Sequence, residues 1–157
     1  MQAAGQAAVY DPGANIDVAT GLTVPKFDQA RDEFSEAARR NPAHADAHAG
    51  LGFVRAIQKA SAEAQREASL ALFHEGDNFV ILHNVACTYA VLSEIDKDQK
   101  QQHQDAAIDY LRPAVKLCRD TGYADIEVGN VEWDKALEKL RDVPDFWERI
   151  GVKGQKE

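Results

Sequence analysis

The stretch His48–Ala71, HAGLGFVRAIQKASAEAQREASLA, decides the fold. Its apolar and small residues recur at helical spacing on both sides of Ser61, which predicts two helices folded against each other. The same residue types return 34 positions away along the chain. Such returns pair Ala30 with Ala64, Ala37 with Ala71, Pro42 with Gly76, His48 with Leu82, Leu51 with Val85, and Gly52 with Ala86. This period predicts an array of helical pairs, with small residues where the helices cross.

The repeated residues follow the consensus of a known helical repeat. Leu51-Gly52 and Tyr89 match the front half of that consensus, and Ala30, Phe34, Ala37 and Pro42 match its back half. On these residues the chain resembles the tetratricopeptide repeat (TPR) family. The run from Asn84 to Ala90 and the short helices expected near the C-terminus are similar to bacterial TPR domains. The resemblance implies an all-α, TPR-like α-α superhelix of about three helix-turn-helix repeats with a C-terminal capping helix.

Patterning divides the chain into four parts: an irregular segment or degenerate first helix at 1–24, the repeats at 25–122, a helical cap at 123–151 and a tail at 152–157. Helices are predicted over Lys26–Asn41, Ala43–Gln58, Ala62–Glu75, Phe79–Ser93, Gln104–Arg119 and Val131–Arg141, with a short last helix after Pro144. The repeat spacing leaves an insertion at about 93–104. Its polar composition favours a solvated loop, the alternative being an extension of either helix.

Composition narrows the function classes. The 157 residues carry a formal net charge of −8. An acidic surface argues against nucleic acid and against an anionic membrane, because both select basic patches. Cys87 and Cys118 both lie in helical patterns, which favours free thiols in a reducing compartment over a disulfide, although pairing of the two stays open. The sequence has no apolar run of about 20 residues and no signal-peptide pattern, so we expect a cytoplasmic protein.

Few side chains form patterns typical of catalysis or of metal binding. No nucleotide loop, nucleophile elbow, Cys-x-x-Cys or HExxH motif is present, so we expect no enzyme and no cofactor. His44, Asp46 and His48 share a helix face, as do His83 and Cys87, and residues of these types are common metal ligands. A packed ring at His48 and too few ligands in either set favour no metal. Trp133 and Trp147 could form a peptide pocket, but such residues more often close a core.

The resemblance implies where a partner would bind. In TPR proteins the first helix of each repeat lines a concave groove. The positions that match this face include Asp46, Phe53, Val80, His83, Asn84 and Cys87, which are the predicted partner contacts. The implied function is a non-enzymatic scaffold that binds a protein or peptide partner in the groove. The alternatives are a self-assembling, homo-oligomeric module and a regulatory domain of a larger enzyme system.

Overall fold

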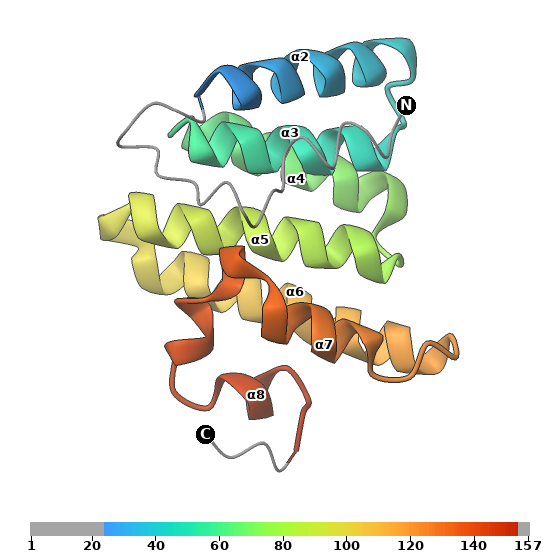
Figure 1. Cartoon of the computed structure of the whole chain (residues 1–157), viewed down its shortest axis with the longest axis vertical. Coiled ribbons are helices and arrows are strands. Elements are labelled where there is room, and N and C mark those ends of the chain that lie inside the picture. The colour runs from blue at the N-terminus through green and yellow to red at the C-terminus, as the bar shows by residue number, and fades with distance from the viewer. Residues whose placement is uncertain (1–23, 154–157) are drawn as a thin grey trace.

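The computed structural model describes residues 24–153, and every regular element over that range is a helix, which confirms the all-α prediction. Its elements are α2 (Val24–Arg40), α3 (Ala45–Ile57), α4 (Ser61–Glu75), α5 (Phe79–Ile95), the 3₁₀ turn η2 (Lys97–Gln99), α6 (Lys100–Asp120), α7 (Ile126–Trp133), the 3₁₀ turns η3 (Lys135–Leu137) and η4 (Leu140–Asp142), and α8 (Phe146–Arg149). The helices from α2 to α6 stack one after another down the molecule (Figure 1). Residues 1–23 and 154–157, which hold most of the predicted N-terminal segment and the tail, lie outside the described range.

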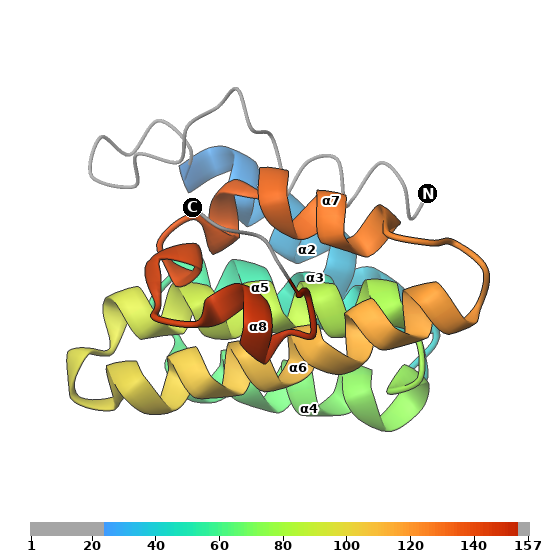
Figure 2. The ribbon, with the colours of Figure 1, turned by 90° about the horizontal axis from the view of Figure 1, so that it is seen from below.

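Neighbouring helices pack in sequence order. The closest packing joins α3 with α4 and α5 with α6, and α3 also packs against α2 and α5. Seen from below, α4 and α6 form one layer and α3 and α5 the next, while α2 and α7 lie on the far side of that second layer (Figure 2). The outer face of α3 and α5 is therefore bounded by α2 at one end of the stack and by α7 at the other.

Small residues set the helix spacing, as the repeat predicts. Most alanines at the repeat positions of the second helices are completely buried, whereas Ala37 in the first of these helices is half-buried. The completely buried ones are Ala30, Ala64, Ala71, Ala107 and Ala114. A methyl group at Gly52 would lie 3.3 Å from the Ala64 carbonyl oxygen and 3.4 Å from the Ala68 nitrogen. The absence of a side chain at Gly52 thus lets α3 approach the backbone of α4.

A second glycine, Gly50 of α3, allows α2 to pack closely against α3. A methyl group at Gly50 would lie 2.4 Å from Cζ of Phe34, so the aromatic ring occupies the space above the glycine. Phe34 is almost completely buried and belongs to the main core. The predicted apolar stripe of this helix is therefore used to cover α3.

Two local predictions differ from the structure. In place of a solvated loop at 93–104, α5 continues to Ile95, and α6 begins at Lys100 after the short turn η2. Most polar residues of this stretch lie on the outer faces of the two helices and of η2, but Ser93 and His103 are buried. The helix predicted over Val131–Arg141 is displaced toward the N-terminus, because α7 begins at Ile126 and ends at Trp133.

The C-terminal segment folds back onto α5 and α6. After α7 it runs through η3, η4 and α8 beside α6 (Figure 2), and buries Leu137, Leu140, Phe146 and Ile150 in the main core. Two arginines hold this segment against α6. Arg119 of α6 donates to the Gly151 carbonyl at 3.1 Å, and Arg149 of α8 forms an ion pair with Asp105 of α6 at 2.9 Å.

Within residues 24–153 no single helix is both long and apolar enough to cross a membrane. One pair of consecutive helical segments, Phe79–Ile95 and Lys97–Asp120, meets the length and composition criteria together, with a bend of 118° between its halves.

Candidate functional site

The six predicted contact residues divide by exposure. Val80 is 43% exposed, and Asp46 and Asn84 are half-buried. The other three, Phe53, His83 and Cys87, are buried. Phe53 packs in the main core, so the ring expected as an anchor for a partner contacts the protein itself.

His83 and Cys87 lie one turn apart on α5 and face α7. His83 Nδ1 is hydrogen-bonded to the Glu127 carboxylate, and His83 Nε2 lies 2.7 Å from Asp134 Oδ2. The Cys87 thiol donates to the same Asp134 oxygen at 3.4 Å. These four side chains are called the His83 cluster below.

Helical geometry explains why α7 supplies two carboxylates. Residues seven positions apart in an α-helix differ by only about 20° in direction. Glu127 and Asp134 have this spacing, so both meet α5 although Asp134 lies just past the helix end. Asp134 Oδ1 accepts the Ala136 N–H at 2.9 Å, and this cap turns the chain into η3.

The cluster shifts the titration of its members. Burial opposes protonation of His83, but the hydrogen bonds to the carboxylates of Asp134 and Glu127 outweigh it and hold the pKa of His83 well above its ordinary value. Burial raises the pKa of Cys87 to about 11, so its sulfur is a thiol at neutral pH. Burial acts against ionisation of Asp134 too, yet the hydrogen bond and charge of His83 leave the pKa of this carboxyl below its ordinary value.

Glu127 is the most enclosed charged residue of the cluster, with 1% of its surface exposed. Its Oε1 faces His83, whereas its buried Oε2 has no hydrogen-bond partner among the described residues. A buried carboxylate with a single partner depends strongly on that partner.

The other histidine-rich set does not converge. His44 Nδ1 accepts the Ala47 N–H as the cap of α3, and His48 places its nitrogens 2.6 Å from Glu67 Oε2 and 2.7 Å from the Pro42 carbonyl. The buried ring at His48 agrees with the predicted packing role. In the described part of the chain, the grouping with metal-ligand chemistry is His83, Cys87 and Asp134.

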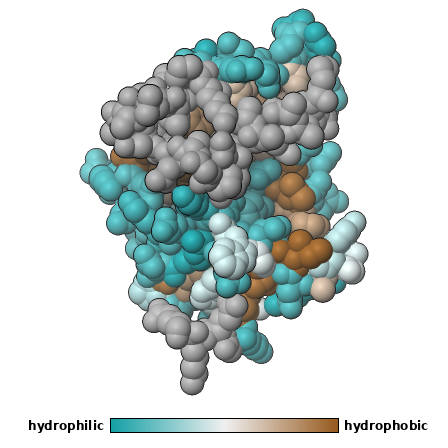
Figure 3. Space-filling model, in the orientation of Figure 1, coloured by the Kyte–Doolittle hydropathy of each residue, from teal (hydrophilic) through white to brown (hydrophobic). Residues whose placement is uncertain are grey.

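Exposed large apolar side chains gather around α7. Of the five on the described residues, four belong to the start of α5, to α7 or to the turn before α7: Val80, Tyr123, Ile126 and Trp133. Ile126 and Trp133 are seven residues apart, so they share the outward side of α7, and Trp133 is 79% exposed. Hydrophobic colour appears on this part of the molecular face in Figure 3. We call these four residues the α7 face.

The two tryptophans therefore have opposite environments. Trp147 packs against the core and against Phe146, as expected for a residue that closes a core. The same expectation for Trp133 is wrong, because α7 ends there and presents the indole to solvent.

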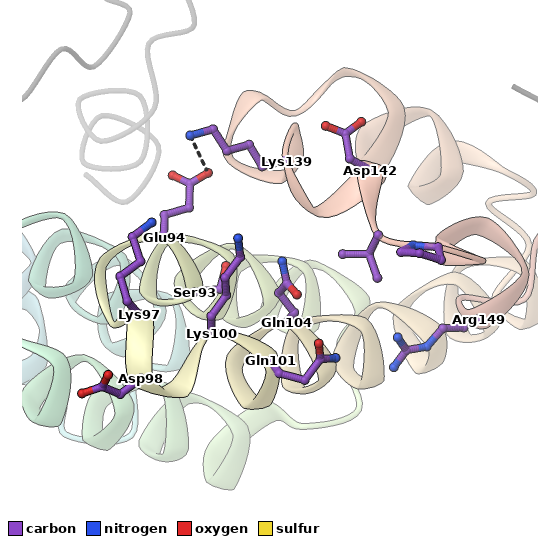
Figure 4. A pocket seen from close by; sticks show the side chains of 12 residues that line it. Ser93, Glu94, Lys97, Asp98, Lys100, Gln101, Gln104, Lys139, Asp142 and Arg149 are labelled. Atoms are coloured by element: carbon purple, nitrogen blue, oxygen red, sulfur yellow. Dashed lines mark ion pairs between the residues drawn. The ribbon is translucent and has the colours of Figure 1, made fainter.

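A polar cleft of about 940 Å³ lies between the α5–α6 turn and the C-terminal segment (Figure 4). Lys139 reaches across it to Glu94 at 3.7 Å, and Lys97 and Lys100 line its wall. Charges of both signs alternate around the cleft, so it favours no single class of ligand.

Sequence reasoning found His83 and Cys87 through their spacing of four residues, but it missed Glu127 and Asp134. The available signal was their spacing of seven, which matches two turns of a helix.

The chain matches no protein-family model, no curated protein and no solved structure.

Proposed function

We propose that this protein is a non-enzymatic, TPR-like interaction module that binds a partner segment on the α7 face. The observation that carries the proposal is Trp133, an indole 79% exposed, which lies two turns from the exposed Ile126 on the same side of α7. Folded proteins rarely leave several large apolar side chains exposed together unless another surface covers them. Tryptophan is also enriched among residues that dominate binding energy.

The superhelical part of the proposal rests on repetition. Small residues recur every 34 positions, most of their alanines are buried at the helix crossings, and consecutive helices pack in chain order. These features are typical of TPR arrays. Val80 and Asn84 keep their predicted role as contacts, and Ile126 and Trp133 join them from α7.

The non-enzymatic part rests on the His83 cluster. His83 and Cys87 are buried under α7, and a thiol with a pKa of about 11 is a poor nucleophile at neutral pH. The net charge of −8 favours a partner with basic residues around an apolar centre, such as an amphipathic helix flanked by lysines.

Affinity capture with matched variants tests the proposal. Wild type, an Ile126→Ser/Trp133→Ala double variant and Phe73→Ala would be used as baits, with bound proteins identified by mass spectrometry. Phe73 is the control because it is 82% exposed on α4, in the opposite layer. We expect a partner retained by wild type and by Phe73→Ala, and weakened about 30-fold or more in the double variant.

Two other results would redirect the proposal. Capture of the same proteins by all three baits would refute binding at the α7 face. If further copies of the protein itself are captured by wild type and by Phe73→Ala but not by the double variant, and no other protein behaves in this way, the result supports self-assembly instead. Light scattering of the purified wild-type protein over a concentration series would then show a dimer that the double variant does not form.

A further inference from the structure

The His83 cluster brings three metal-ligand atoms together from segments far apart in sequence. His83 Nε2, Cys87 Sγ and a carboxylate oxygen of Asp134 all lie within 4.8 Å of one another. We propose that these three side chains form a binding site for a divalent transition-metal ion of the zinc class. This inference does not depend on the proposed partner binding.

The ligand distances suit such an ion. Zinc bonds to nitrogen, sulfur and oxygen are about 2.0–2.3 Å long, so a tetrahedral ion holds sulfur and oxygen ligands about 3.6 Å apart and nitrogen and oxygen ligands about 3.4 Å apart. Cys87 Sγ and Asp134 Oδ2 are already 3.4 Å apart. His83 Nε2 and the same oxygen are 2.7 Å apart, so ion entry requires an opening of about 0.7 Å there.

Glu127 supplies the outer support that metal-bound histidines usually have. Its Oε1 holds His83 Nδ1, which directs Nε2 toward Cys87 and Asp134. Carboxylate–histidine–metal arrangements of this kind fix the ring orientation and strengthen the ligand. The other oxygen, Oε2, is buried and has no hydrogen-bond partner among the described residues, so the orientation of Glu127 depends on His83.

Asp134 is prepared to offer one oxygen. The Ala136 N–H occupies Oδ1, which leaves Oδ2 as the ligand. A thiolate, an imidazole and one carboxylate oxygen form a mixed set that selects zinc or cobalt over magnesium or calcium. Three protein ligands leave a fourth position for water.

Binding exchanges the ion for two protons. The ion forms bonds to His83 Nε2 and to Cys87 Sγ, and the protons on that nitrogen and on that sulfur are released to solvent. The total charge of the cluster is unchanged, because two positive charges enter as the ion and two leave as protons. Burial of the ion under α7 therefore adds no net charge to the interior.

The test uses the full-length protein, freed of metal by dialysis against a chelator and then titrated with Co²⁺. Thiolate ligation of Co²⁺ produces a charge-transfer band in the near ultraviolet. We expect a band that saturates at one ion per chain and is abolished by Zn²⁺. Zn²⁺ at 100 times its Kd should also raise the melting temperature by about 5–10 °C.

Matched variants identify the ligands. Cys87→Ala should abolish the band, whereas Cys118→Ala, at the other buried cysteine, should retain it. Glu127→Gln should keep the band and weaken affinity about 10–100-fold. Asp134→Asn gives a second readout of the ligand set should Cys87→Ala not fold by circular dichroism, and it too should lower affinity. Absence of the band in wild type, or its persistence in Cys87→Ala, would overturn the proposal.

Discussion

Replacement of His83 by leucine in metal-free protein tests how far Glu127 depends on a single partner. The carboxylate of Glu127 is 1% exposed, and His83 donates its one hydrogen bond. His83→Leu keeps a side chain of similar volume but leaves a buried charge without a partner, which costs about 3–5 kcal/mol. Domains of this kind have a total stability of about 5–15 kcal/mol, so the loss is large but measurable.

The reverse replacement should cost less. In Glu127→Leu the His83 ring keeps Asp134 at 2.7 Å, so one hydrogen bond is lost and no charge is stranded. We expect a loss of about 1–3 kcal/mol. The double variant His83→Leu/Glu127→Leu removes the Glu127 charge as well, whereas Asp134 loses its bond to His83 in this variant and in His83→Leu alike, so comparison of the two isolates the cost of the unpaired Glu127. It should be more stable than His83→Leu alone by about 2 kcal/mol or more.

The assay is urea unfolding followed by tryptophan fluorescence, with a chelator present throughout. Trp147, which packs against the core, reports unfolding. Asn84→Ala, at the next position on α5, is the control and should change the unfolding free energy by less than about 0.5 kcal/mol. The reasoning is refuted if the double variant is no more stable than His83→Leu, because Glu127 would then not depend on this histidine.

Three further predictions use the same unfolding assay. Gly50→Ala should destabilise the protein by about 1–3 kcal/mol, because its methyl group would lie 2.4 Å from the Phe34 ring. Gly129→Ala should stabilise it by about 0.5–1 kcal/mol, because nothing lies within 4 Å of the added methyl group. Equal effects of the two substitutions would contradict the packing argument. The pKa of Cys87 in the folded protein, about 11, lies above its ordinary value, so the unfolded chain loses the thiol proton at lower pH than the folded protein does. The free energy of unfolding should therefore fall by about 3 kcal/mol as pH rises from about 9 to 11, and Cys87→Ala should lack this fall. Trp133→Ala should leave the unfolding free energy within about 0.5 kcal/mol of wild type, and a larger loss would place the indole in the core.

The helices and their crossings were predictable because they depend on local patterns. Ala64 and Ala71 lie on one face of α4, and the charged residues around them lie on other faces. A small residue at such a position can be recognised in the sequence without knowledge of the partner helix. Both alanines are fully buried, as the period of 34 predicts. The bounds of α7 were not predictable in the same way, because Val131, Leu137 and Leu140 follow a helical spacing and are all buried although they belong to three different elements.

The His83 cluster was only half predictable. His83 and Cys87 are four residues apart, so their shared face follows from helical geometry. Glu127 and Asp134 lie 44 and 51 residues from His83, and only the return of the chain after α6 brings them to α5. No local rule encodes that return. The TPR-like superhelix, the partner and the cellular location remain predictions from the sequence.

The same separation has a consequence during protein synthesis. At about 5–20 residues per second, the ribosome adds Glu127 and Asp134 about 2–10 s after His83. During that interval α5 can already pair with the helices made before it, whereas His83 and Cys87 lack the segment that buries them. The nascent chain therefore passes through a stage in which this thiol is accessible to oxidants and to passing ions, and the emergence of α7 ends it.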